Sequence, residues 1–152
     1  MIKDFKFHSP APVYFGHETV KNNADLIASY GKRCYITTTR FPAGCENAAL
    51  NDFISVCKDK GIEYMVNEDV VENPTVESCV EMAREAREFG AEFFAGIGGG
   101  SSMDTAKAVS VLLTQPEDID AYDFFFKNPG DAADPWRRPY AVSYTHLTLP
   151  TN

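Results

Sequence analysis

The chain has 152 residues, of which 44% are hydrophobic and 24% charged, and its formal net charge is -8. This length fits one α/β domain of ordinary size, and the composition is typical of a folded chain. The negative charge argues against a nucleic-acid partner, because a phosphate backbone requires clustered Lys and Arg. No apolar run approaches the roughly 20 residues that cross a bilayer. Since the start also lacks a signal-peptide pattern, we expect a cytoplasmic location and no membrane partner.

The spacing of the cysteines and histidines argues against redox pairs and metal sites in this chain. The four cysteines are widely separated and form no CxxC pair, so we expect reduced thiols. The histidines at positions 8, 17 and 146 show neither HxxxH nor HxxE spacing. We therefore expect no metal ligand among these residues.

Apolar residues that recur at helical or strand periods predict an alternation of helices and strands. Gly31, Gly61 and Gly90 stand where helices end in a left-handed residue, and Thr75 can cap the start of one. In chain order, the expected elements are edge strands within residues 5–15, a helix over 20–30, a strand over 33–37, a helix over 50–57, a strand over 62–66, a helix over 75–90, a strand over 93–97 and a helix ending near 113. Beyond these, only residues 121–126 are expected to be helical.

This alternation is typical of an α/β fold with a doubly wound, Rossmann-like parallel sheet. In such folds the ligand crevice lies at the carboxyl ends of the strands. Residues 37–40 and 98–101 follow two of the predicted strands at that edge. We therefore expect the functional site at these two loops.

Three consecutive glycines, Gly98, Gly99 and Gly100, connect an apolar strand to a helix. Without Cβ atoms the main chain can be approached closely by a ligand, and the following helix offers unpaired N–H groups and a partial positive charge. Ser101 and Ser102 can add hydroxyl donors. The segment is thus predicted to bind an anion such as a dinucleotide pyrophosphate. The alternative is a tight turn without a ligand, in which Ser101 or Ser102 is the helix N-cap.

Two common phosphate-binding motifs do not fit this loop. A Gly-x-Gly-x-x-Gly motif starting at Gly96 would need glycine at position 101, where Ser101 stands, and no Gly-Lys-Ser/Thr follows. Asp104 and Lys107 lie three residues apart on one helix face and can form an ion pair. Spacing alone leaves open whether that pair is functional or an ordinary surface pair.

Residues 98–107, with the sequence Gly-Gly-Gly-Ser-Ser-Met-Asp-Thr-Ala-Lys, resemble the Gly-Gly-Gly-Ser-x-x-Asp-x-x-Lys element of iron-containing (group III) alcohol dehydrogenases. Similarity extends to the Asn-Pro-Thr turn at 73–75 and to residues 12–16. The resemblance covers roughly residues 5–142 and is to the N-terminal, nucleotide-binding domain of that family. It implies a dehydroquinate synthase-like fold for this part and a helical metal-binding domain that is missing here.

The resemblance also implies roles for particular residues. Gly98, Gly99, Gly100 and Ser101 would bind the pyrophosphate of NAD(P), Asp104 would lie near the nicotinamide, and Asn73 would line the cofactor cleft. For Asn73, a role in forming the turn is an equal alternative.

The resemblance also bears on the choice between NAD and NADP. Many NAD-preferring members carry Asp where this chain has Thr38, and without that carboxylate a 2′-phosphate is not repelled. We therefore expect NADP to be accepted and slightly favoured. Residues 37–39, which include Thr38 and Thr39, and Arg40 are the candidate phosphate contacts.

In that family a divalent metal is bound by one Asp and three His that lie downstream of this region. The resemblance therefore implies Fe²⁺ or another divalent metal only in a full-length parent enzyme, which transfers hydride between NAD(P) and an alcohol or aldehyde and is a homo-oligomer. This chain alone would hold no catalytic residue and be inactive. Three alternatives remain: a glycerol dehydrogenase, in which Lys usually replaces Ser101, a dehydroquinate synthase-like relative, or a non-catalytic nucleotide-binding module.

The last ten residues depart from the family pattern. Residues 142–151 can be encoded by DNA that resembles a transposase-type sequencing adapter, read in frame. We therefore expect a dinucleotide-binding domain over 1–142 and an artefactual tail over 143–152. The alternative is a natural short terminus with β-like alternation.

Overall fold

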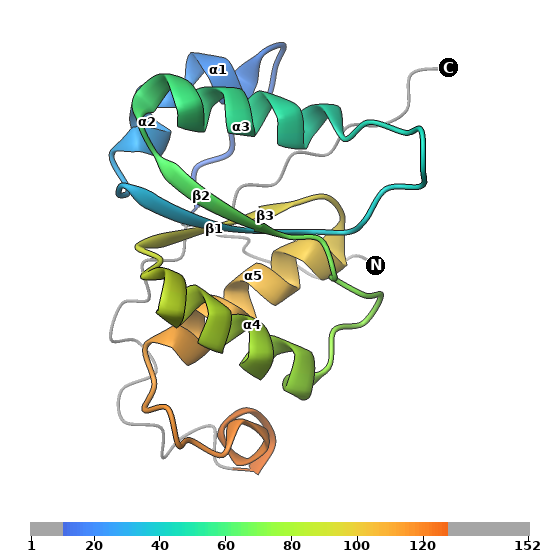
Figure 1. Cartoon of the computed structure of the whole chain (residues 1–152), viewed down its shortest axis with the longest axis vertical. Helices are drawn as coiled ribbons and strands as arrows, with labels where there is room; N and C mark the ends of the chain where they lie inside the picture. Colours follow the sequence, from blue (N-terminus) through green and yellow to red (C-terminus); the bar gives the residue numbers. More distant parts are fainter. Residues whose placement is uncertain (1–10, 128–152) are drawn as a thin grey trace, which may run out of the picture.

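The computed structural model describes residues 11–127, and a parallel sheet lies at its centre (Figure 1). The sheet contains β1 (Arg33–Thr38), β2 (Glu63–Asn67) and β3 (Phe93–Ile97), in the order β2-β1-β3. Every residue of β1 except Arg33 is buried, and β3 is buried throughout. Strands that are buried along almost their whole length are expected where helices cover both faces of a sheet.

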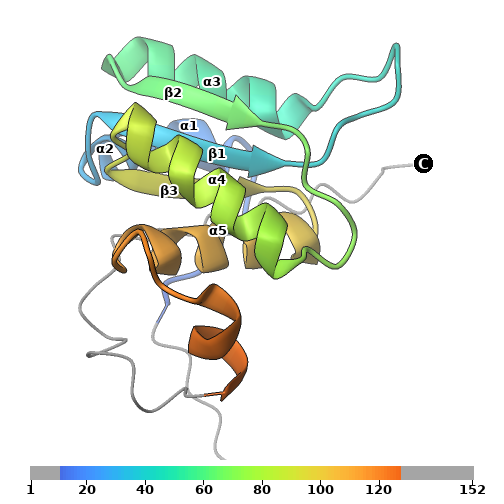
Figure 2. The ribbon, with the colours of Figure 1, turned by 60° about the horizontal axis from the view of Figure 1, so that its bottom comes forward.

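Helices cover both faces of the sheet (Figures 1 and 2). On one side lie α1 (Thr19–Asn22), α2 (Ala24–Ala28) and α3 (Ala48–Lys60), and on the other lie α4 (Val76–Phe89) and α5 (Gly100–Leu113). Successive residues of β1 point to opposite faces: Cys34 and Ile36 belong to the core under α3, and Tyr35 belongs to the core under α4 and α5. The prediction of a doubly wound α/β fold is confirmed.

Local residues determine where α3 and α4 begin and end. The side chains of Asn47 and Thr75 accept hydrogen bonds from the third N–H of each helix, at 3.1 and 3.2 Å. Gly61 and Gly90 end the helices with φ values of 64° and 74°. These left-handed conformations are the reason for glycine at both positions, and the predicted helix ends are confirmed.

The first predicted helix, over residues 20–30, is wrong as a single element. It is interrupted at Asn23, whose φ is -108°, and forms the short helices α1 and α2. The Asn23 side chain donates to the carbonyl oxygen of Thr19 at 2.8 Å, in competition with regular helical bonding. Gly31 is not a left-handed cap: its φ is 156°, and a Cβ there would lie 2.7 Å from Glu92 Oε2. This backbone angle and the close approach of the Glu92 side chain together favour glycine there.

The other expectations have mixed outcomes. The edge strands within 5–15 are not found over residues 11–15, and residues 1–10 lie outside the described part of the chain. The expected helix at 121–126 is present as a short helical turn that continues into a π-helix, Asp123–Lys127. Within residues 11–127, no helix is both long and apolar enough to cross a bilayer.

Buried thiols make the fold sensitive to alkaline pH. Cys34, Cys57 and Cys79 are buried, and burial raises the pKa of each, that of Cys57 to about 11. Burial and the hydrogen bond to Glu85 raise the pKa of Tyr35 as well. Each group therefore holds its proton more tightly in the folded state than in the unfolded state. Its contribution to the free energy of unfolding is complete below the pKa of the unfolded state and is lost as the pH rises through the pKa of the folded state.

We therefore predict that the urea concentration at the midpoint of unfolding decreases as the pH is raised from 8 to 11. Cys57→Ala should lower the midpoint at pH 8 but reduce its fall toward pH 11, because one of the responsible thiols is gone. Cys45→Ala is the control, since Cys45 is exposed. A fall of the same size in Cys57→Ala and in the unchanged chain would contradict this assignment.

Candidate functional site

The carboxyl edge of the sheet brings together three chain segments that are far apart in the sequence. In the strand register, Thr37 pairs with Asn67 on one side, and Thr38 pairs with Ile97 on the other. The residues that follow β1 therefore lie between those that follow β2 and β3. This edge contains both loops that the sequence predicts as functional.

Two glycines allow α5 to start directly against the sheet. A Cβ at Gly96 would lie 2.8 Å from the Ser102 carbonyl oxygen and 2.9 Å from Met103 Cα. A Cβ at Gly98, where φ is 137°, would lie 2.9 Å from Ser102 Oγ. The absence of side chains at these positions therefore permits the close packing of the first turn of α5.

The next two glycines are open to solvent. Added Cβ atoms at Gly99 and Gly100 would meet nothing within 4 Å. Helix α5 begins at Gly100 with Gly99 as its N-cap, and no side chain caps it. The alternative in which Ser101 or Ser102 is the N-cap is therefore wrong, because the helix starts earlier and both serines lie inside its first turn. The first N–H groups of α5 have no helical partner and lie beside an accessible main chain.

Buried hydroxyls add unused hydrogen-bonding capacity to this end of α5. Ser102 Oγ and Thr105 Oγ1 are buried and have no partner among the described residues. Neither hydroxyl is exposed to solvent, so in this conformation neither can contact a ligand at the surface. The open glycines and the uncapped start of α5 are what fit a cofactor that carries phosphate groups.

The threonines at the end of β1 differ in accessibility. Thr37 Oγ1 donates to the Ser102 carbonyl oxygen at 2.9 Å, and Thr38 Oγ1 accepts from Asn47 Nδ2 at 3.2 Å. Both threonines are fully buried, whereas Thr39 is half-buried and Arg40 exposed. Of the four candidate contacts for a 2′-phosphate, Thr39 and Arg40 are the ones at the surface. The role of Thr38 stays a prediction.

An acidic residue that the sequence reasoning missed lies beside Arg40. Asp69 follows β2, forms an antiparallel bridge with Thr39, and accepts a hydrogen bond from Arg40 Nη2 at 2.7 Å. Both side chains of this ion pair are exposed, by 70% for Arg40 and 72% for Asp69. The sequence did offer a signal for this residue, because it is acidic and comes just after the strand that pairs with β1.

Asn73 and Asp104, the other two predicted site residues, are exposed. Asn73 has a left-handed backbone with φ of 56°, which supports its role in the turn before α4. Asp104 accepts from Lys107 Nζ at 3.3 Å, so the predicted pair is confirmed. Their contacts with a cofactor stay predictions.

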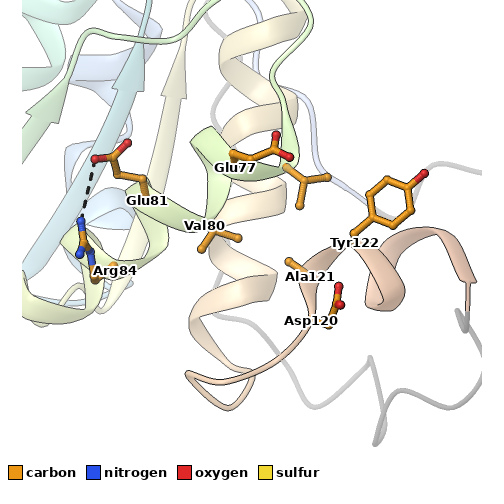
Figure 3. A pocket seen from close by; sticks show the side chains of 8 residues that line it. Glu77, Val80, Glu81, Arg84, Asp120, Ala121 and Tyr122 are labelled. Carbon is orange, nitrogen blue, oxygen red and sulfur yellow. Dashed lines mark ion pairs between the residues drawn. The ribbon is translucent and has the colours of Figure 1, made fainter.

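A hollow of about 480 Å³ lies away from this edge, between α4 and residues 120–122 (Figure 3). Val76 and Val80 of α4 and Ala121 line it, and an Arg84–Glu81 ion pair lies on its side. No residue of 37–40 or 98–104 lines it, so we place no cofactor there. Across residues 11–127, no three His, Cys, Asp or Glu side chains are grouped to hold a metal ion.

Known proteins with similar sequences support the same interpretation as the geometry of this edge. The family model for iron-containing alcohol dehydrogenases matches residues 10–145. The chain belongs to this family. A relative, the long-chain primary alcohol dehydrogenase AdhA of Thermoanaerobacter ethanolicus, is 33% identical over 114 residues, which are 73% of this chain and 29% of the relative.

Other relatives agree with this family assignment. A sulfoacetaldehyde reductase of Bilophila wadsworthia is 42% identical over 62 residues, which are 41% of this chain and 16% of that protein. The crystal structure of an iron-containing alcohol dehydrogenase from Thermotoga maritima superposes with a TM-score of 0.76 at 26% identity, over 93% of this chain and 38% of that one. The chain thus spans well under half the length of these relatives, and the predicted family and fold are confirmed.

Substitutions of the glycines in this site should affect stability differently, depending on whether the glycine is packed against other atoms. We predict that Gly96→Ala lowers the free energy of unfolding by about 1–3 kcal/mol, because its Cβ would push α5 away from β3. The matched variant Gly100→Ala should lower it by less than about 0.5 kcal/mol, since nothing lies near its Cβ and alanine is favourable in a helix. Urea denaturation measures both, and equal effects would contradict the proposed contact.

Proposed function

We propose that this chain is the cofactor-binding part of an NAD(P)-dependent, metal-containing alcohol dehydrogenase. The observation that carries the proposal is the uncapped start of α5 beside the exposed Gly99 and Gly100, in a chain of this family. In the whole enzyme, the reaction is hydride exchange between a nicotinamide and a small alcohol or aldehyde. A homo-oligomeric state and a cytoplasmic location belong to the same proposal.

In this proposal, residues 98–101 bind the pyrophosphate. The N–H groups of the first turn donate to phosphate oxygens, and the positive end of the helix dipole favours their charge. Ser101 adds a hydroxyl donor. Asn73 lines the cleft, and Asp104 lies toward the nicotinamide, which supplies the hydride chemistry when bound.

We further propose that the metal and the substrate contacts belong to the family's downstream domain. The four metal ligands of the family would lie there, so this chain alone should show no dehydrogenase activity. Its own residues would bind and orient the cofactor. The helix dipole and the main-chain N–H groups would provide affinity for the cofactor, and no residue of this chain would carry out a redox or proton-transfer step.

The absence of the NAD-typical Asp at Thr38 supports acceptance of NADP, with a slight preference for it. Thr39 and Arg40 are the accessible groups that would meet a 2′-phosphate. A guanidinium is well suited to a phosphate, because it can donate two parallel hydrogen bonds.

Calorimetric titration with NADP tests the loop assignment. We predict that Gly99→Asp weakens binding about tenfold or more, because a carboxylate would stand where the phosphates bind. Asp is a favourable N-cap residue, so the helix itself should persist. Gly99→Asn is the matched control of the same size without the charge, and it should bind more tightly than Gly99→Asp. Unchanged NADP affinity in Gly99→Asp would refute the assignment.

We propose that residues 1–142 form the native domain and that residues 143–152, which lie outside the described residues, derive from adapter DNA. Sequencing the genomic locus across codon 142 tests this. The expected result is a different codon series that continues the family pattern. A locus that encodes residues 143–152 as printed would contradict it.

A further inference from the structure

Two residues of opposite charge share the surface where β1 and β2 end. Arg40 Nη2 lies 2.7 Å from Asp69 Oδ1, and the backbones are joined by the bridge between Thr39 and Asp69. Arg40 stands where a phosphate-binding residue is proposed. Asp69 therefore places a carboxylate next to the same ligand position.

Hydrogen bonds to residues in the interior of the fold fix the position of the Asp69 backbone. Its backbone N–H donates to Asn67 Oδ1 at 3.0 Å, and Asn67 Nδ2 donates to Glu85 Oε2 at 2.9 Å. The same Glu85 oxygen accepts from the buried Tyr35 hydroxyl at 2.6 Å. A chain of hydrogen bonds thus ties the backbone of Asp69 to the core, while its carboxylate stays at the surface.

We infer that Asp69 is a specificity-determining residue that limits the preference for NADP, chiefly because its carboxylate would repel a 2′-phosphate bound at Arg40. The inference rests on the proposed cofactor site. In dinucleotide-binding α/β folds, an acidic side chain accepts from the ribose 2′-hydroxyl of NAD, whereas an arginine accommodates the 2′-phosphate of NADP. This chain presents both groups within hydrogen-bonding distance of each other.

The two cofactors would use this pair differently. NAD can donate its 2′-hydroxyl to Asp69 and leave the ion pair intact. NADP must draw Arg40 away from Asp69, and its 2′-phosphate then lies near a carboxylate. Because the pair is exposed, releasing Arg40 costs little. The larger penalty is repulsion between a phosphate of nearly two charges and the Asp69 carboxylate, equivalent to roughly tenfold in affinity for a separation of about 6 Å in water.

The test is calorimetric titration of the 152-residue chain with NADP⁺ and with NAD⁺. Asp69→Asn should raise NADP⁺ affinity about tenfold and change NAD⁺ affinity far less, and high salt should reduce this gain. Arg40→Met should lower NADP⁺ affinity while NAD⁺ affinity is nearly unchanged. Asp59→Asn is the matched control, because it removes the same charge from an exposed residue near the end of α3.

Each outcome separates the inference from the proposed function. If Asp69→Asn leaves the ratio of the two affinities unchanged while both cofactors still bind, the specificity role is overturned and the cofactor site stands. An equal shift in Asp59→Asn also overturns it, because net charge would then be responsible. If the folded, unchanged chain binds neither cofactor, the proposed function of this chain fails and the inference fails with it.

Discussion

The structure depends on the contact between the first turn of α5 and the two strands beneath it. Gly96 brings the backbone of β3 against Ser102 and Met103, and the buried Thr37 hydroxyl donates to the Ser102 carbonyl oxygen. These contacts involve backbone atoms, so they leave the helix little freedom to slide or tilt. They hold the unpaired N–H groups of α5 at the carboxyl edge of the sheet, where the proposed phosphate binding requires them.

The two ends of α5 differ in their hydrogen bonds to side chains. At its carboxyl end, Arg87 Nη2 donates to the carbonyl oxygens of Leu112, Leu113 and Gln115, at 3.1–3.3 Å. At its amino end, no side chain caps the helix, and two hydroxyls in its first turns lack partners. A positive side chain at the negative end and no acidic residue in the first turn leave the positive end of the helix dipole available to an anion.

The two edges of the sheet show the same contrast. At the amino edge, the Glu92 carboxylate accepts from the Lys32 N–H at 2.7 Å and pairs with Arg33 at 3.0 Å. Arg33 also donates to the Gly90 carbonyl oxygen, so that edge satisfies its own polar groups. At the carboxyl edge, the Arg40–Asp69 pair is largely exposed, and the glycine loop has no capping side chain. The uncapped helix start and the open main chain are therefore found at the carboxyl edge.

The sequence alone determined the order of the main strands and helices, the ends of α3 and α4, and the family, because these depend on local signals. Gly61, Gly90 and Thr75 act through their own backbone or that of near neighbours, and the motif at 98–107 is contiguous. The same local signals failed for residues 20–30, where the Asn23 side chain competes for a helix carbonyl.

Only the tertiary structure decided which polar residues are free to bind. Thr37 and Thr38 look equivalent to Thr39 in the sequence, yet parallel pairing and the approach of α5 bury them and engage their hydroxyls. Asp69 is 29 residues from Arg40, and only the bridge after β1 and β2 brings the two charges together. Contacts between parallel strands join residues separated by a whole helix, so no local pattern reveals them.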